Sequence, residues 1–332
     1  MTGAAEPVRW GFVSLAGIND RVLPELEDSD AIELVAVASR SEEAARDYAE
    51  EREFARAHGS YDALLADPDV EAVYIPLPNS MHVEWAIRAL EAGKHVLCEK
   101  PLGRRAAEVE RAFDVADRAG LILMEAFMYR HHPQTRRASE LIAEGAISEL
   151  RLVRSHFGFT LGEGENVRLR QELHGGALMD VGCYCVSGAR LLAGEPETVI
   201  GTQVVGSSGV DVRFAATLVF DGPVLGHFDC GFDVPDNSLL EAVGSDGTLR
   251  IPTPFLVGSP GIELIRGGDT ERVEVAAAPA YRLEFENMSA AIRGTAEPLL
   301  GRDDSLGQAR AIEALYRSAE GGGEAVAVAA PG

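Results

Sequence analysis

Lysine is nearly absent from this sequence, and the position of one of its two lysines is informative. Only Lys94 and Lys100 occur, so arginine supplies almost all of the positive charge. Lys100 follows Glu99 and the short apolar run 95–98, and Pro101 comes directly after it. An ammonium group where a buried strand meets a proline-stopped turn suggests chemistry. These residues alone equally allow a lysine that merely ends a strand.

The sequence also lacks the features that would direct it to a membrane or to nucleic acid. No stretch approaches the ~18 uninterrupted apolar residues of a membrane span. The formal net charge of −23 would repel a phosphate backbone, although a local site can still hold positive charge for an anionic small ligand. Residues 1–7 lack the basic and apolar regions of a signal peptide. We therefore expect a cytoplasmic protein that binds neither nucleic acid nor a membrane.

Cysteine is too sparse for a disulfide framework, because the chain of 332 residues contains only four. Cys183 and Cys185 have a spacing that suggests metal binding. A second clustered pair of ligands is missing, however, and the two side chains would point to different sides of a helix. We therefore expect no metal.

Strands and helices alternate over the first part of the chain at the spacing of βαβ units. This pattern predicts a doubly wound parallel sheet with its ligand at the carboxyl ends of the strands. The expected strands are 8–13, 32–38, 70–76, 95–98 and 121–124. The expected helices include one that begins after the N-cap Ser41, with further helices at 61–65, 82–91 and 106–119.

The pattern changes after about residue 130. Helices are expected at 134–144 and 177–192, a long strand at 150–159, and a series of short strands between 198 and 275 whose turns indicate an antiparallel meander. Two helices, 283–293 and 305–318, close the chain, and the small residues 321–332 are expected to be frayed. We assign residues 1–125 to a nucleotide-binding domain and residues 126–325 to a substrate-binding and oligomerisation domain.

The turn after the first strand is an imperfect dinucleotide fingerprint. Ser14, Ala16 and Asn19 stand where G-x-G-x-x-G would have glycines that allow a pyrophosphate to approach the backbone. The end of the second strand is more informative, because Ser39 and Arg40 replace the acidic residue that binds the ribose of NAD. This favours NADP over NAD.

Three motifs together resemble the glucose–fructose oxidoreductase, inositol dehydrogenase and rhizopine-catabolism (Gfo/Idh/MocA) family. They are Gly93 to Leu102 (GKHVLCEKPL) preceded by Pro76 to His82 (PLPNSMH), Met124 to Gln134 (MEAFMYRHHPQ), and Gly175 to Tyr184 (GGALMDVGCY). The resemblance extends in order over residues 8 to about 320. Within the family, the chain is most similar to xylose-type aldose dehydrogenases and to ketoreductases that act on nucleotide-linked sugars.

The resemblance implies a Rossmann domain followed by an α+β domain with a large, mostly antiparallel sheet, and a homodimer or homotetramer. It implies that Lys100 hydrogen-bonds the reacting oxygen of a sugar or sugar-nucleotide substrate beside the nicotinamide. Asp180 would hold the sugar or a catalytic partner, and Tyr184 would exchange the proton. With the strand ends, it assigns cofactor binding to Ser14, Leu15, Ala16, Ser39, Arg40, Leu77, Pro78, Asn79, His82, Glu99 and Lys100, and substrate binding to Arg168, Gln171 and Asp180.

Elementary chemistry supports the assignment of Tyr184. Asp180 and Tyr184 are four residues apart, so their side chains share one face of a helix. A phenol with an unperturbed pKa of ~10 is a poor base, but a nearby ammonium such as Lys100 would stabilise its phenolate. The alternative is a core aromatic residue bonded to Asp180.

Three departures from the family pattern bear on function. They are the missing fingerprint glycines, His174 in place of a third glycine before Gly175, and Tyr184 where many members have histidine. The interpretation we favour is an NADP-dependent aldose 1-dehydrogenase or ketosugar reductase. The alternatives are a dehydrogenase of cyclic diols or polyols and a non-catalytic sensor that binds the cofactor.

Overall fold

The computed structural model describes residues 6–162, 164–256, 258 and 260–329, and it divides into two compact units. The first unit takes the chain up to Gly103 together with Ala107–Met128 and Pro279–Ser305. The second takes Arg104–Ala106, Tyr129–Ala278 and the chain from Leu306. None of the described helices is both long and apolar enough to cross a membrane.

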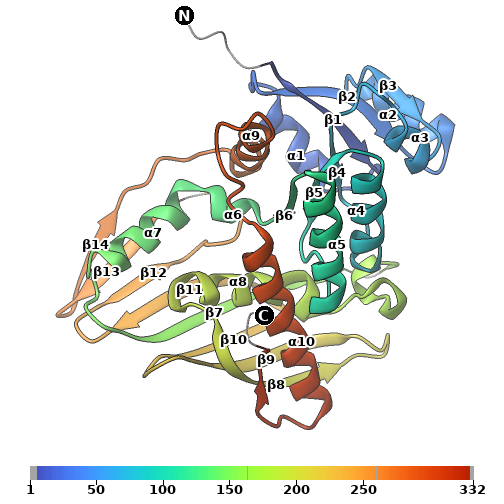
Figure 1. The fold of residues 1–332 in the computed structure, drawn as a ribbon. Coiled ribbons are helices and arrows are strands. Elements are labelled where there is room, and N and C mark those ends of the chain that lie inside the picture. Colours follow the sequence, from blue (N-terminus) through green and yellow to red (C-terminus); the bar gives the residue numbers. More distant parts are fainter. Residues whose placement is uncertain (1–5, 163, 257, 259, 330–332) are drawn as a thin grey trace, which may run out of the picture. The chain divides into compact units, whose positions relative to one another are not determined.

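The first unit contains a six-stranded parallel sheet in the order β3-β2-β1-β4-β5-β6 (Figure 1). Pairing of Val13 with Ala38, of Ile75 with Cys98 and of Glu99 with Ala126 brings the carboxyl ends of the strands to one edge. The strands are β1 (Val8–Val13), β2 (Ile32–Ala38), β3 (Arg56–His58), β4 (Ala72–Ile75), β5 (His95–Glu99) and β6 (Leu123–Ala126). The helices are α1 (Asn19–Leu26), α2 (Glu42–Glu51), α3 (Tyr61–Leu65), η1 (Asn79–Met81), α4 (His82–Glu91), α5 (Ala106–Ala119) and α9 (Ala280–Ile292).

The local signals in the sequence explain most of these elements. The central strand β4 is buried throughout, as expected for a strand covered on both faces. Ser41 caps α2 by accepting a hydrogen bond from Ala44 N at 3.3 Å, as predicted. Strand β6 ends at Ala126, two residues later than expected, and the short edge strand β3 was not predicted.

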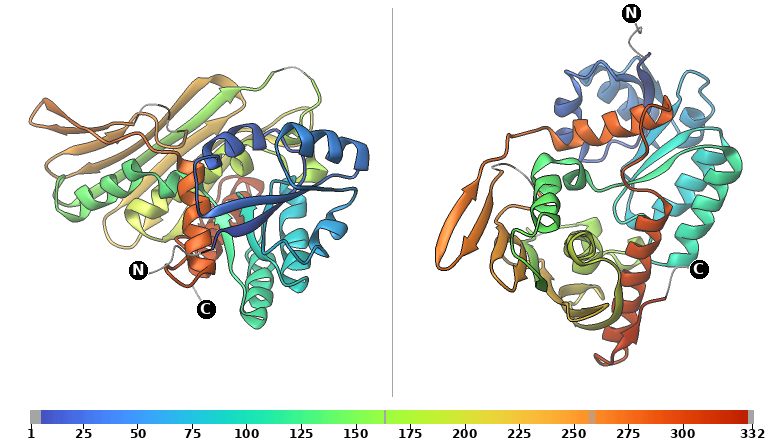
Figure 2. Two further views of the ribbon diagram at one scale, coloured as in Figure 1. Left: turned by 90° about the horizontal axis from the view of Figure 1, so that it is seen from above. Right: turned by 60° about the vertical axis from the view of Figure 1, so that its left-hand side comes forward.

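Helix α9 packs on the first sheet, although the sequence assigned residues 126–325 to the second domain. The Phe285 ring lies 4.6 Å from Trp10 and 5.3 Å from Tyr74, measured between ring centroids, and Trp10 Nε1 donates to Ser289 Oγ at 3.3 Å. Figure 2 shows this late segment of the chain beside the N-terminal strands. Contacts between aromatic residues that are so far apart in the sequence leave no periodic pattern. The sequence therefore did not predict that α9 packs on the first sheet.

The second unit is built on a nine-stranded sheet in the order β14-β13-β12-β11-β7-β10-β9-β8-β15. Every neighbouring pair is antiparallel except β10 with β7, which is parallel. The strands are β7 (Leu150–Thr160), β8 (Pro196–Val205), β9 (Asp211–Phe220), β10 (Leu225–Gly231), β11 (Asp233–Gly244), β12 (Thr248–Ile251), β13 (Ile262–Arg266), β14 (Asp269–Val273) and β15 (Val326–Ala327). The helices are α6 (Met128–His131), α7 (Pro133–Ala143), η2 (Val167–Leu169), η3 (Gln171–Leu173), η4 (Leu178–Gly182), α8 (Cys183–Ala193) and α10 (Arg302–Glu320).

Two expectations about the second unit are corrected by the structure. The segment expected as one helix over 177–192 begins with η4, a π-helical turn, and becomes α-helical only at Cys183. The tail expected to be frayed contains β15, which pairs with β8 through Val326 and Ala327. Without β15, strand β8 would leave its backbone N–H and C=O groups unpaired at the edge of the sheet. Pairing with β15 satisfies some of these groups, although the residues around β15 are small.

Candidate active site

The turn after β1 has the backbone of a phosphate-binding turn although its glycines are replaced. Ser14 has a φ of 129°, a region that glycine enters readily and other residues rarely. The turn is held by Asn19 Nδ2, which donates to Ser14 O at 3.0 Å, and by Ser14 Oγ, which donates to Pro76 O at 3.3 Å. Ser14 and Asn19 therefore replace the missing glycines with hydrogen bonds.

The same turn leaves backbone donors for an anionic ligand. Within the described chain, the N–H groups of residues 15–18 have no acceptor, and no side chain caps the start of α1. A Cβ added at Gly17 would meet no atom within 4 Å, so the space beside the turn is open. Free amides at the start of a helix favour a phosphate, and the turn containing Leu15 and Ala16 fits the pyrophosphate of a dinucleotide.

Arg40 follows the carboxyl end of β2 and is exposed. Among the described residues it makes no hydrogen bond or ion pair, whereas many other arginines in the chain pair with carboxylates, as Arg46 does with Glu42. Ser39 is half-buried, and its Oγ accepts from Ser41 N at 3.3 Å. The guanidinium is therefore available to an anionic group on a ligand at this edge.

The backbone around Lys100 is fixed by three side chains. Glu99 Oε2 accepts from Lys100 N at 3.2 Å, and the other carboxylate oxygen of Glu99 accepts from Tyr74 Oη at 2.7 Å. The buried His82 ring lies 2.8 Å from Pro101 O through Nδ1. Glu125, near the end of β6, accepts a hydrogen bond from the backbone N–H of Leu102, the residue after Pro101, at 2.8 Å. The lysine is thus presented from a rigid turn at the ligand edge of the sheet.

His82 and Leu77 belong to the residues predicted to bind the cofactor, and the structure gives them a supporting position. His82 Nε2 lies 2.7 Å from Leu77 O, so the ring bridges the end of β4 and the Lys100 turn. Pro78 and Asn79 are half-buried; Pro78 precedes η1, and Asn79 is the first residue of η1. The sequence did not identify Tyr74, whose hydroxyl has no local pattern that would indicate its partner.

The second lysine has an unrelated structural role. Lys94 is 7% exposed, and its Nζ donates to Asp67 O and Val70 O at 2.7 Å each. Burial lowers the pKa of this ammonium. Lys94 therefore satisfies backbone carbonyls before β5 begins, whereas Lys100 follows the end of that strand.

A buried carboxyl adjoins the Lys100 turn. Glu284 on α9 is fully buried, and neither of its carboxylate oxygens has a hydrogen-bond partner among the described residues. Burial, followed by the charges of Glu99 and Glu25, raises the pKa of Glu284 well above its ordinary value. Burial also raises the pKa of Tyr74, with a further contribution from Glu99. Both shifts favour the protonated, uncharged forms of Glu284 and Tyr74.

In the second unit, the structure brings together Arg168 and Asp180. Arg168 Nε donates to Asp180 Oδ2 at 2.6 Å, and Asp180 is only partly buried. Gly175 is required here, since a Cβ at that position would lie 2.3 Å from Arg168 O. His174, which stands in place of a third glycine, adopts the left-handed conformation with φ of 54°. Gln171 is exposed, and its Oε1 lies near Gly209 instead.

Tyr184 is 6% exposed and lies in a cluster of aromatic rings. Its ring centroid lies 5.7 Å from Tyr129, 5.5 Å from Phe157 and 5.4 Å from Phe255. These contacts fix the orientation of the phenol in the first turn of α8, and Asp180 stands in the preceding π-helical turn. Short π-helical turns of this kind are frequent at functional sites. The i,i+4 spacing of Asp180 and Tyr184 was interpreted as one face of an α-helix, and it did not predict this wider turn.

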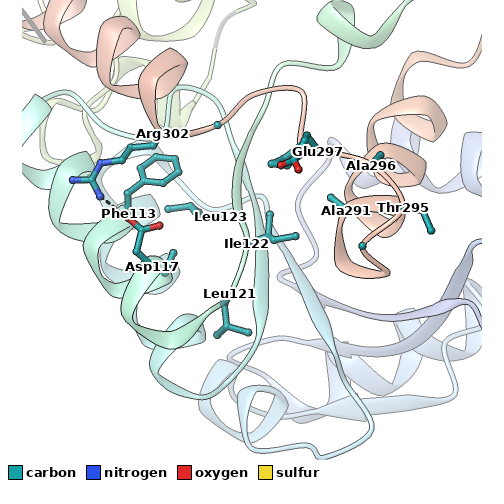
Figure 3. A pocket seen from close by; sticks show the side chains of 14 residues that line it. Phe113, Asp117, Leu121, Ile122, Leu123, Ala291, Thr295, Ala296, Glu297 and Arg302 are labelled. Atoms are coloured by element: carbon teal, nitrogen blue, oxygen red, sulfur yellow. Dashed lines mark hydrogen bonds and ion pairs between the residues drawn. The ribbon is translucent and has the colours of Figure 1, made fainter.

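A hollow of about 500 Å³ in the first unit is lined by none of the predicted site residues (Figure 3). Leu121, Ile122 and Leu123 line it at the amino end of β6, the opposite end from Glu125 and Ala126. Its one guanidinium, Arg302, already pairs with acidic side chains of α5, including Asp117. The hollow is therefore not the ligand edge of the sheet.

A parallel sheet of this order, open amides before α1 and an anchored lysine at the same edge define a Rossmann-type nicotinamide-dependent oxidoreductase. Family models agree with this class. Residues 8–127 match the model described as "Oxidoreductase family, NAD-binding Rossmann fold", and residues 135–250 match the "GFO/IDH/MocA C-terminal domain". The chain belongs to the Gfo/Idh/MocA oxidoreductase family.

Individual relatives match over nearly the whole chain. D-xylose 1-dehydrogenase (NADP(+)) 2 of Haloferax volcanii is 40% identical over 321 residues, covering 94% of this chain and 98% of the relative. The 3-ketoreductase KijD10 of Actinomadura kijaniata, solved with NADP and TDP-benzene, is 33% identical with a TM-score of 0.89, covering 94% and 98%. Trans-1,2-dihydrobenzene-1,2-diol dehydrogenase of Danio rerio is 32% identical over 274 residues, covering 80% of this chain and 79% of the relative.

These comparisons confirm the resemblance, the two-part fold and the enzyme class that the sequence predicted. The chain is an NAD(P)-dependent oxidoreductase, so the interpretation as a non-catalytic sensor is not retained. Lys100 and all the other residues predicted to bind the cofactor lie in the first unit. Asp180, Tyr184 and Arg168 lie in the second unit.

Proposed function

We propose that this chain is an NADP-dependent oxidoreductase that transfers hydride between the nicotinamide and a hydroxyl or carbonyl carbon of a sugar or sugar nucleotide. The observation that carries the proposal is the Lys100 turn, anchored at the carboxyl edge of a Rossmann sheet. The relatives named for xylose oxidation and for 3-ketoreduction support a sugar as the substrate.

Arg40 supports the choice of NADP. Its exposed guanidinium, without a partner in the described chain, stands at the strand end where the adenosine ribose of a dinucleotide is read. A charge-assisted hydrogen bond to a 2′-phosphate contributes ~1.5–3 kcal/mol. Arg40→Leu should therefore weaken NADPH binding by about 10- to 100-fold and leave NADH binding unchanged. Arg46→Leu, which removes an arginine paired with Glu42 on α2, is the matched control.

Lys100 and Tyr184 support a proton relay. NADP, when bound, supplies the nicotinamide carbon that accepts or donates the hydride. In alcohol oxidation the substrate O–H bond breaks, and its proton passes to the phenolate oxygen of Tyr184 while the Lys100 ammonium hydrogen-bonds the reacting oxygen. In carbonyl reduction the Tyr184 hydroxyl returns that proton. Asp180, paired with Arg168, is available to a sugar hydroxyl at the same helix.

The test is a substrate panel with matched variants. We expect NADP⁺-dependent oxidation of free aldoses, or NADPH-dependent reduction of a nucleotide-linked 3-ketosugar. Lys100→Met and Tyr184→Phe should each lower kcat/KM by about 100-fold or more. Tyr129→Phe, which removes the neighbouring hydroxyl bonded to Ser187, should change kcat/KM only a few-fold. Undiminished turnover by Lys100→Met would refute the relay.

Oxidation of a cyclic diol is a second candidate, favoured by the similarity to trans-1,2-dihydrobenzene-1,2-diol dehydrogenase. It uses the same proton relay and differs only in the shape of the substrate pocket. Cyclic trans-diols with NADP⁺ therefore belong in the same panel. A diol turned over with higher kcat/KM than any aldose or ketosugar would establish this alternative.

A homodimer or homotetramer remains part of the proposal. Ile200, Val204 and Val205 on β8 and Leu225 on β10 are exposed apolar side chains of the large sheet. Size-exclusion chromatography with light scattering tests the proposal. A monomeric mass at all micromolar protein concentrations would contradict it.

A further inference from the structure

A single buried carboxylate ties together three elements around the start of the Asp180 helix. Asp211, the first residue of β9, is 3% exposed. Its Oδ2 accepts from Leu178 N, at the start of η4, at 2.7 Å, and its Oδ1 accepts from Tyr316 Oη on α10 at 3.0 Å. Both oxygens therefore accept hydrogen bonds, one of them from the backbone of the turn that contains Asp180.

The glycine pair before this turn is fitted to the same carboxylate. Gly176 has a φ of 124°, and a Cβ at this position would lie 2.1 Å from Asp211 Oδ1. Gly176 N donates to Arg168 O at 2.9 Å, and Arg168 is the ion-pair partner of Asp180. Asp211 thus lies against the backbone that positions both Arg168 and Asp180.

Arg104 extends the arrangement toward the Lys100 segment of the chain. Its guanidinium carbon lies 3.8 Å from the centroid of the Tyr316 ring, and Arg104 Nη2 donates to Glu320 at 3.2 Å. Arg104 comes four residues after Lys100, and by its contacts it belongs to the second unit. The chain that follows the Lys100 turn therefore contacts, through Arg104, the tyrosine that donates a hydrogen bond to Asp211.

Ionisation of Asp211 is energetically unfavourable at this position. Burial raises the pKa of Asp211 to about 6, although the hydrogen bonds from Leu178 and Tyr316 and the charge of Arg104 oppose the shift. The groups that interact with it are Tyr316 from α10, Arg104 from its short segment and the Cys230 thiol from β10. A neutral side chain would avoid this penalty, and such conflicts between stability and local structure occur mainly at functional sites.

We propose that ionised Asp211 is a positioning residue for the oxidoreductase reaction: it holds the turn that carries Asp180, and Tyr316 with Arg104 connects it to the Lys100 segment. This inference rests on the proposed function. A carboxylate accepts two hydrogen bonds at once, whereas protonation converts one oxygen into a donor that competes with Leu178 N–H or Tyr316 O–H. Loss of the negative charge at acidic pH therefore loosens the Asp180 turn.

The first test compares the wild-type protein with Asp211→Asn. We expect kcat to fall by about 10- to 100-fold, since small misplacements of reacting groups have effects of this size, with NADPH affinity unchanged. The acid limb of the kcat profile, expected near the pKa of Asp211 at about 6, should disappear in the variant. Full activity of Asp211→Asn with the acid limb retained would overturn the proposal.

Three further variants separate positioning from simple loss of stability. Tyr316→Phe and Arg104→Leu each remove a contribution that favours the ionised carboxylate, so each should move the acid limb to higher pH. Arg104→Lys keeps the charge and should restore it. An acid limb that neither Tyr316→Phe nor Arg104→Leu moves would contradict the proposal.

Hydrogen exchange supplies a readout that does not depend on the substrate. After correction for intrinsic rates, peptides covering residues 176–184 should exchange faster in Asp211→Asn at pH 7, and faster in the wild type at pH 5 than at pH 7. Unchanged protection overturns the inference even if no sugar is turned over. Changed protection with no oxidoreductase activity in the wild type would overturn the proposed function alone.

Discussion

Glu284 offers a prediction whose size follows from its environment. The side chain is fully buried with both oxygens unpartnered in the described chain, and burial raises its pKa well above the ordinary value of 4.5. A charged carboxylate without hydrogen bonds is not tolerated in such a place. Folding therefore favours the protonated form of Glu284.

The sign and the magnitude of the pH effect can be worked out from this proton. A group whose pKa is raised on folding contributes stability that is complete below its unfolded pKa, 4.5, and that is lost as the pH rises toward the folded value. The loss is about 1.4 kcal/mol per pH unit. As the pH rises above 4.5, Glu284 should therefore lower the free energy of unfolding, by at most about 1.4 kcal/mol per pH unit.

Glu284→Gln removes this dependence because an amide does not titrate. The unpartnered amide adds a constant offset, so the diagnostic quantity is the change with pH of the difference between variant and wild type. Urea unfolding at pH 5, 6 and 7 should show this difference moving in favour of glutamine as the pH rises, by at most about 1.4 kcal/mol per pH unit. Glu286→Gln, a half-buried carboxyl on the same helix bonded to Ser29, is the control. A difference for Glu284→Gln that is constant across this range would refute the reasoning.

Three further predictions concern the turns that hold the site. Ser14→Gly should be more stable to urea than Ser14→Ala by about 1 kcal/mol, the reverse of the usual order, because the φ of 129° strains any residue with a Cβ; an alanine variant of equal or greater stability would disprove the strain. Gly175→Ala should lower the unfolding free energy by about 1–3 kcal/mol, since its Cβ would approach Arg168 O to 2.3 Å, whereas Gly17→Ala, facing open space, should change it by less than about 0.5 kcal/mol. Asp211→Asn should gain stability over the wild type by up to about 3 kcal/mol as the pH rises from 4 to 6, because the pKa of Asp211 is raised from 3.8 to about 6, and a shrinking gain would show that this carboxylate is stabilising.

The first unit could be predicted from the sequence because its signals are local. The strands 8–13 and 32–38 and the helices 61–65, 82–91 and 106–119 were placed with the bounds that the structure has. Each is marked by an apolar run or a stripe of apolar positions, with turn residues at its ends. Parallel pairing then brings Ser14, Arg40 and Lys100 to one edge of the sheet without further information.

The supporting contacts could not be predicted because they join residues far apart in the chain. Tyr74 and Glu99, or Asp211 and Leu178, meet only after the sheets have formed. The partner of Asp180 was not foreseen either, although Arg168 had been considered for the substrate. The glycine pair was identified as a motif, but its cause, a close approach to Arg168 O and to Asp211, required coordinates.

The scarcity of lysine has a practical consequence for chemical modification. Lys94 is buried with its ammonium bonded to two carbonyls, and Lys100 is the half-buried lysine at the candidate catalytic position. Acylating reagents, reductive methylation and amine-coupled surfaces react with lysine side chains and with an α-amine, and of the two lysines Lys94 is buried while Lys100 is half-buried. Immobilisation through lysine would therefore occupy the candidate catalytic position, and a lysine-directed affinity label would have only the buried Lys94 as a competing lysine.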